Sequence, residues 1–116
     1  MTFDYVDYLK GIADITRVRI MGVLAQIKQE LCVCQIMAAL GESQYKISRH
    51  LRILKNTGWL KERRDGRWVY YSLLDTADPV VSKWLEALAA IPLDYLRLAM
   101  SLAEVKTFSR TNTCKE

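Results

Sequence analysis

The apolar side chains at the start of the chain recur every three or four residues, as on one face of an α-helix. Asp14 can accept hydrogen bonds from the first free amides of one such helix, and Gly41 stands where a helix often ends in a left-handed residue. The spacing therefore predicts three helices, over residues 3–12, 14–28 and 33–40.

A fourth helix is predicted over residues 43–56, with Ser43 as its cap. At about 100° per residue, its apolar side chains fall in one narrow stripe, while Arg49 and Arg52 lie on the opposite face. The stripe comprises Ile47, Leu51 and Leu54. We therefore expect one face of this helix in the core and the other in solvent.

A β-hairpin should follow, because two strand-like runs over residues 59–63 and 67–73 flank Asp65-Gly66, a dipeptide that favours a tight turn. Asp78-Pro79 then supplies a cap and a first-position proline for another helix, and Pro92 interrupts it before a last helix over residues 93–102. A helix that presents a polar face, followed directly by a hairpin, is typical of a winged helix-turn-helix. We predict a mainly α fold with a β-hairpin wing.

The length of 116 residues allows one compact domain, and a composition of 51% hydrophobic and 26% charged residues is that of an ordinary globular protein. We assign residues 1–105 to this domain and the polar residues 106–116 to a flexible tail. No apolar run approaches the roughly 18 residues of a membrane helix, and the first residues lack the pattern of a signal peptide. We therefore expect a cytoplasmic protein that does not enter a membrane.

The positive charge is concentrated in one part of the chain. Residues 44–67 carry eight Lys or Arg against two acids, so this segment has a charge of +6 while the whole chain has only +4. Such a concentration favours an acidic partner, and the predicted fold points to double-stranded DNA. The candidate groove-reading residues of the fourth helix are Gln44, Tyr45, Lys46, Ser48, Arg49 and Arg52, and the candidate phosphate contacts of the hairpin are Arg63, Arg64 and Arg67.

His50 is the only histidine, and it lies about 60° from the centre of the apolar stripe. A histidine in this position more often packs against the core or fills a backbone contact than binds a metal. No carboxylate partner is evident from the spacing. We interpret His50 as structural.

Cys32 and Cys34 lie at the predicted start of the third helix, where the positive end of the helix dipole favours thiolates. Thiolates are soft metal ligands, although buried cysteines are more often small core residues. In a regular helix the two side chains would point about 200° apart. To hold one ion together, either Cys32 must lie before the helix or the first turn must unwind, which would move the helix behind it.

The chain resembles the ArsR/SmtB family of winged-helix metalloregulators, and in particular the arsenical-resistance repressors. Four stretches carry the resemblance in the family's order: residues 9–17 (LKGIADITR), 30–34 (ELCVC), 43–51 (SQYKISRHL) and 65–71 (DGRWVYY). The resemblance implies a homodimer that binds operator DNA and leaves it when trivalent arsenic or antimony binds the cysteines. It implies no permanent cofactor. It also implies a dimer interface built by the first and last helices, with Tyr5, Leu9, Trp84 and Leu88 as its apolar residues.

One departure from the family pattern concerns the third sulfur ligand. Repressors of this type often carry a further cysteine three residues after Cys-Val-Cys, where this chain has Met37. The third ligand could be Cys114, a small cellular thiol, or nothing. A zinc or cobalt sensor is disfavoured, because the late helix lacks the histidines that such family members use.

Two other functions remain as alternatives. A repressor on the same fold could respond to thiol oxidation instead of a metalloid. A disulfide between cysteines two residues apart would be strained, which favours the metalloid reading. An enzyme is improbable, since the sequence shows no pair of nucleophile and base, no phosphate-binding glycine loop and no clustered carboxylates.

Overall fold

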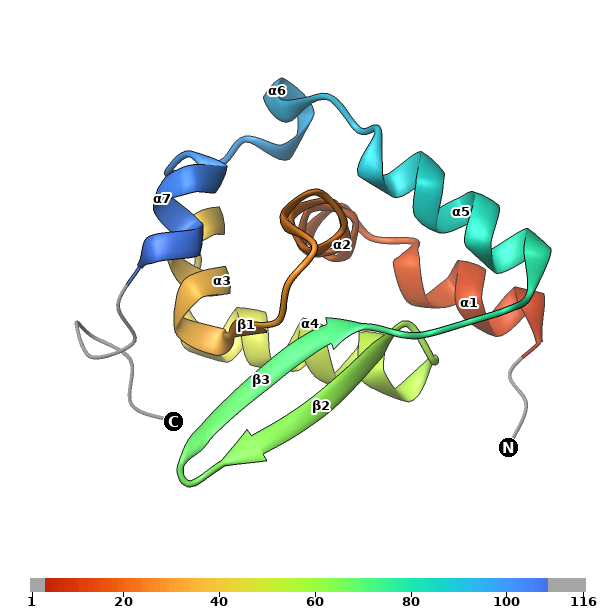
Figure 1. The fold of residues 1–116 in the computed structure, drawn as a ribbon, viewed down its shortest axis with the longest axis horizontal. Coiled ribbons are helices and arrows are strands. Elements are labelled where there is room, and N and C mark those ends of the chain that lie inside the picture. Colours follow the sequence, from red (N-terminus) through yellow and green to blue (C-terminus); the bar gives the residue numbers. More distant parts are fainter. Residues whose placement is uncertain (1–3, 109–116) are drawn as a thin grey trace.

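The computed structural model describes residues 4–108 and shows a helical domain with a small antiparallel sheet at one side (Figure 1). The elements in chain order are α1 (Tyr5–Ile12), α2 (Ile15–Ile27), β1 (Leu31–Cys32), α3 (Val33–Leu40), α4 (Gln44–Asn56), β2 (Leu60–Asp65), β3 (Trp68–Leu73), α5 (Pro79–Ala89), α6 (Leu93–Leu96) and α7 (Leu102–Thr107). The predicted combination of helices with a hairpin wing is confirmed. Among the described residues, no helix has the length and apolar content to cross a bilayer.

Side-chain caps fix the starts of three helices where the sequence predicted them. The Asp14 carboxylate accepts hydrogen bonds from two backbone amides at the start of α2, and the Asp78 carboxylate does the same for α5. The Ser43 hydroxyl accepts from the Lys46 amide at the start of α4. Each cap satisfies amides that have no partner inside the helix, so these boundaries follow from local chemistry.

Helix α2 is the centre of the core. It is surrounded by α1, α3, α4 and α5 in Figure 1, and its buried residues are distributed around the whole circumference. Ile20, Met21 and Val23 are fully buried. A helix that is buried on all sides requires neighbours on all sides. The other helices are amphipathic and supply this shell.

The sheet has the strand order β1-β3-β2, and β1 was not predicted. Its two residues pair with β3 far along the chain, Leu31 opposite Tyr71 and Cys32 opposite Tyr70. The hairpin turn lies one residue later than expected, because Asp65 pairs with Trp68 and leaves Gly66 and Arg67 as the loop. Gly66 adopts a φ of +63°, a conformation for which glycine has no steric penalty.

The predicted helix over residues 93–102 is wrong. Helix α6 ends at Leu96, Arg97 adopts a left-handed conformation, and the chain then runs across α3, where the Ala99 amide donates to the Ala39 carbonyl over 2.7 Å. Ser101 starts α7 with a capping box completed by Glu104. Helix α7 packs against α3 and includes residues 106 and 107, which the sequence had assigned to the tail.

Candidate functional site

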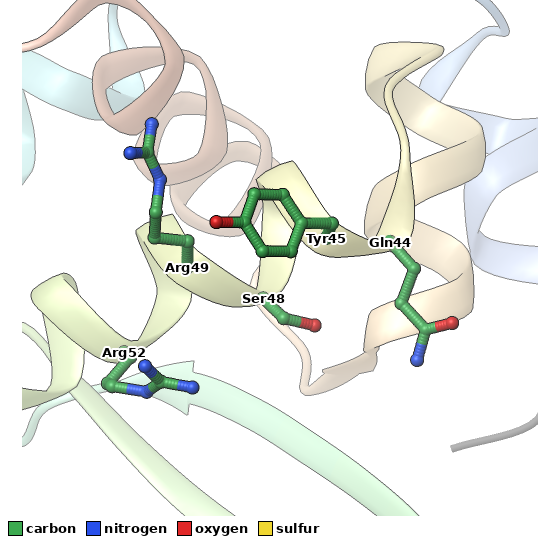
Figure 2. Close-up of a pocket in the computed structure, with 5 residues that line it drawn as sticks. All are labelled: Gln44, Tyr45, Ser48, Arg49 and Arg52. Atoms are coloured by element: carbon green, nitrogen blue, oxygen red, sulfur yellow. The ribbon is translucent and has the colours of Figure 1, made fainter.

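Helix α4 has the two faces that its sequence predicted. Ile47, Leu51 and Leu54 are fully buried against the core. On the opposite face a hollow is lined by the side chains that Figure 2 shows projecting from α4, namely Gln44, Tyr45, Ser48, Arg49 and Arg52. Five of the six groove-reading candidates on this helix therefore lie together.

This outer face of α4, the five residues just listed, offers the chemistry that a major groove requires. Tyr45 is 80% exposed although it is a large aromatic residue. An amide, two hydroxyls and two guanidinium groups can together pair with base edges and phosphates. Lys46, the sixth candidate, lies beside this surface, with its ammonium 3.3 Å from the Glu42 carboxylate in the preceding turn.

The wing, defined as residues 60–73, adds positive charge beside α4. A second hollow between the two elements is lined by Ser48 and Arg52 from α4 together with Arg64 from β2. The Arg64 side chain is 69% exposed. Lys55 lines the same hollow and was missed as a candidate, since the sequence argument stopped one helical turn earlier. Its ammonium lies 3.2 Å from the Glu62 carboxylate.

All three wing arginines have partners within the protein, and Arg64 Nε lies 3.9 Å from the Glu62 carboxylate. Arg63 forms a two-pronged ion pair with Glu30, and its guanidinium carbon lies 4.5 Å from the centre of the Tyr70 ring. The hydrogen bond from Arg63 lowers the pKa of the Glu30 carboxyl. The guanidinium of Arg67 lies 5.9 Å from the Trp68 ring centre. The sequence offered no signal for these contacts, because each depends on the folded sheet.

His50 is buried, and its structural interpretation agrees with its contacts. Its Nδ1 accepts a hydrogen bond from Arg17 at 3.0 Å, since arginine can only donate. Burial lowers the pKa of His50, and the neighbouring carboxylate of Asp14, 3.7 Å from Nδ1, only partly opposes this. The spacing along the chain offered no carboxylate partner for His50, and Asp14 becomes one only because the fold brings the start of α2 against α4.

The two candidate metal ligands lie in one apolar cluster. Cys32 is fully buried and Cys34 is 2% exposed. Trp68, Tyr70 and Phe108 pack against them. Cys34 is disulfide-bonded in the structure. We call these five residues the thiol cluster, after the reduced state of the two cysteines.

Cys32 has an extended backbone, with φ −81° and ψ 165°, and it immediately precedes α3. This is one of the two arrangements that the sequence argument allowed. Both cysteines can therefore contribute to one cluster while α3 remains intact, so the first turn of α3 does not have to unwind to bring them together.

Gln35 connects the thiol cluster to the last helix. Its side-chain oxygen accepts from the Cys32 amide over 2.9 Å, and its nitrogen donates to the Val105 carbonyl over 3.2 Å. Met37 packs against the main core and not against the thiol cluster, so its thioether does not join the cysteines. Cys114 lies outside the described residues. Among residues 4–108, no three His, Cys, Asp or Glu side chains come together as a metal site would require.

Comparison with known proteins agrees with this geometry. Residues 14–61 match the family model described as bacterial regulatory protein, arsR family. An arsenic resistance transcriptional regulator of Pseudomonas putida is 42% identical over 87 residues, which are 75% of this chain and 71% of that protein. The arsenical resistance operon repressor of Escherichia coli is 42% identical over 68% of this chain and 63% of its own length.

Solved structures show the same fold. HlyU from Vibrio cholerae superposes with a TM-score of 0.61 at 30% identity and covers 72% of this chain and 89% of its own. The AntR antimony-specific transcriptional repressor superposes with a TM-score of 0.59 at 32% identity, over 71% of this chain and 70% of its own. The proteins named in these comparisons are regulators of transcription and not enzymes.

Proposed function

The chain belongs to the arsR family of bacterial regulatory proteins, a DNA-binding family, and we propose from this premise that it is a metalloid-responsive repressor. It binds operator DNA as a homodimer and leaves the DNA when trivalent arsenic or antimony binds its cysteine thiolates. The observation that carries the proposal is the thiol cluster, because it joins two sulfur ligands to the wing strand beside the outer face of α4.

DNA binding is supported by the position of the charged side chains. The outer face of α4 supplies groups for base edges, and Arg52 and Arg64 line one hollow between helix and wing. Arginines in this arrangement can contact phosphates on both sides of a groove, which makes binding dependent on salt. Arg63 and Arg67 remain candidates for phosphate contact, with Tyr70 and Trp68 of β3 beside their guanidinium groups.

A metalloid inducer is supported by the chemistry of Cys32 and Cys34. Thiolates bind soft ions, and Trp68 and Tyr70 beside them exclude water. Trivalent arsenic prefers three sulfurs. We propose Cys114 as the third ligand, with a small cellular thiol, or no third sulfur, as the alternatives. A relative named for arsenic resistance and a structural neighbour named for antimony support these elements as the inducer.

The proposed dimer would use the exposed apolar residues of α1. Tyr5, Val6 and Leu9 are all exposed. Of the two residues on α5 that the family resemblance placed at the interface, Leu88 is buried within the subunit and Trp84 packs edge-on against Tyr5. We therefore assign the interface mainly to α1 together with Val80, which is exposed at the start of α5.

A DNA-release assay tests the proposal. Fluorescently labelled DNA from upstream of the protein's own gene is bound by the reduced protein and titrated with arsenite, in a phosphine reductant that does not compete for arsenic. Arsenite should release the DNA. Cys32→Ser and Cys34→Ser should bind DNA normally and fail to respond, and Cys114→Ser reports whether the tail supplies a ligand.

Two outcomes would overturn the metalloid function. Both single cysteine variants could keep the full arsenite response, which would place the inducer elsewhere. Alternatively, the wild-type protein could release DNA with peroxide and not with arsenite, which would establish the redox function instead. A titration with cadmium in parallel separates soft-metal sensing in general from metalloid sensing.

A further inference from the structure

One row of side chains crosses the sheet from the thiol cluster to the wing. Cys32 on β1 is directly opposite Tyr70 on β3, and Tyr70 is directly opposite Arg63 on β2. Directly opposed residues of neighbouring antiparallel strands point to the same face of a sheet. Cys32, Tyr70 and Arg63 therefore form a continuous row on one face.

The Tyr70 ring contacts both ends of this row. It packs against the two cysteines, and it lies under the guanidinium of Arg63 at 4.5 Å. Glu30, immediately before β1, holds Arg63 in place from the side, accepting from its Nε over 3.0 Å. A guanidinium over an aromatic face is attracted by the ring quadrupole, and the carboxylate fixes its direction.

We propose that Tyr70 is a positioning residue that couples occupation of the thiol cluster to the placement of Arg63 on the wing. The proposal rests on the proposed inducer site and adds the route by which that site acts on DNA binding. An arsenic atom bound to Cys32 and Cys34 occupies more space than the two thiol protons it replaces. Since Cys32 is fully buried against Tyr70, the ring must move, and Arg63 loses its support.

The step takes place in the reduced protein, because Cys34 is disulfide-bonded in the structure. A thiol or phosphine reductant first opens that disulfide, is itself oxidised, and leaves Cys34 as a thiol. Arsenite, As(OH)₃, exchanges two hydroxyls for the two sulfurs, and each departing hydroxyl takes a thiol proton and leaves as water. Arsenic remains trivalent throughout. The change that acts on the wing is the larger volume of the group between the cysteines and the Tyr70 ring.

The route through Tyr70 differs from a route through the helices. Cys34 is on α3, and α3 packs against α4, so the inducer could instead shift the outer face of α4 directly. The two routes predict different effects of substitutions on the wing. Only the sheet route depends on the ring of Tyr70 and on the ion pair between Arg63 and Glu30.

The test measures the coupling factor, which is the ratio of the DNA dissociation constants with and without saturating arsenite. Tyr70→Leu removes the ring that supports Arg63, so DNA binding without inducer should already be weakened toward that of the arsenite-bound wild-type protein. Arsenite should still bind, as calorimetry measures, but the coupling factor should be smaller than in the wild-type protein by about 2-fold to 30-fold. Tyr70→Phe keeps the ring and should restore the wild-type coupling factor. Glu30→Gln tests the exposed end of the row if Tyr70→Leu does not fold.

A matched pair of arginine variants separates coupling from simple charge. Arg63→Gln and Arg64→Gln each remove one positive charge from adjacent positions on opposite faces of β2. Both should weaken DNA binding, but only Arg63→Gln should reduce the coupling factor.

If the coupling factor of Tyr70→Leu equals that of the wild-type protein, the inference is overturned while the proposed function stands. If Tyr70→Leu does not fold, an unchanged coupling factor in Glu30→Gln has the same consequence. An absence of any arsenite response in the wild-type protein overturns the proposed function itself.

Discussion

Replacement of Arg19 by methionine is a sharp test of how the C-terminal segment is held to the core. Arg19 lies on α2 and is 8% exposed. Its Nε donates to the Leu96 carbonyl over 2.6 Å, and one terminal nitrogen donates to the carbonyls of Leu40 at 3.2 Å and Arg97 at 2.9 Å. The other lies 3.5 Å from the Glu42 carboxylate. One side chain therefore ties α2 to the end of α3 and to the end of α6.

The size of the effect follows from what Arg19→Met leaves behind. Methionine keeps most of the apolar stem, so the loss is chiefly that of the donors. Three carbonyl oxygens lose a charged donor, and a buried acceptor left unpaired costs about 1–3 kcal/mol. The Glu42 carboxylate keeps Lys46 as a partner and adds little to the loss. The hydrogen bonds are not additive, and the carbonyl of Arg97 can be reached by water. We therefore expect about 3–4 kcal/mol of lost unfolding free energy.

Urea denaturation followed by circular dichroism measures this loss at one fixed protein concentration, so that any dimerisation contributes equally. With a slope of about 1–3 kcal/mol per molar urea, the midpoint should fall by at least about 1 M. Arg52→Met is the matched control, because Arg52 is exposed on the outer face of α4 and should change the free energy by less than about 0.5 kcal/mol. A loss of less than about 1 kcal/mol for Arg19→Met would refute the argument.

Three further predictions follow from single contacts. Arg49→Ala should weaken operator binding by about 1–3 kcal/mol if Arg49 reads a base, measured by fluorescence anisotropy, whereas Lys83→Ala on α5 should leave it unchanged. The lowered pKa of folded His50 means that the unfolded state takes up the proton first, so the free energy of unfolding should fall as the pH drops below about 6.5. Denaturation at pH 7.5 and 5.5 should show a smaller fall for His50→Asn than for the wild-type protein, and an equal fall in both proteins would contradict this. Gly11→Ala should cost about 1–3 kcal/mol of stability in thermal unfolding, because the new Cβ would lie 2.2 Å from Thr57 Oγ1; an unchanged midpoint would show that Thr57 can move aside.

The sequence was sufficient for the elements whose boundaries are set locally. Asp14, Ser43 and Asp78 each cap a helix within three residues of their own position, so their chemistry can be read without knowledge of the fold. The buried stripe and the outer face of α4 likewise follow from helical period alone. Those parts of the fold and the groove-reading candidates were predictable for this reason.

The sequence was insufficient where distant segments decide the structure. Two residues of β1 become a strand only because β3, about forty positions later, offers a free edge. The break after α6 depends on Arg97 and on the hydrogen bond of Ala99 to α3. A capping-box pattern from Ser101 to Glu104 was present in the sequence and could have revealed the start of α7.

The candidate site divides in the same way. The identity of Cys32 and Cys34 could be taken from the sequence, but their surroundings could not, since Trp68, Tyr70 and Phe108 reach them from β3 and from the end of α7. For the same reason the wing arginines could be identified as charged candidates but not assigned their aromatic and carboxylate partners.

The extended conformation of Cys32 changes the physical problem that induction has to solve. In a helix the two sulfurs would diverge, and an inducer would need to unwind a turn to reach both. Here they already share one cluster, and the obstacle is the aromatic cover that buries them. Trp68 and Tyr70 in that cover are also the rings beneath Arg67 and Arg63. Under the proposed function, an inducer that approaches the sulfurs from this side must displace the two rings that support the wing arginines, which would make access to the thiols and release of DNA parts of the same rearrangement.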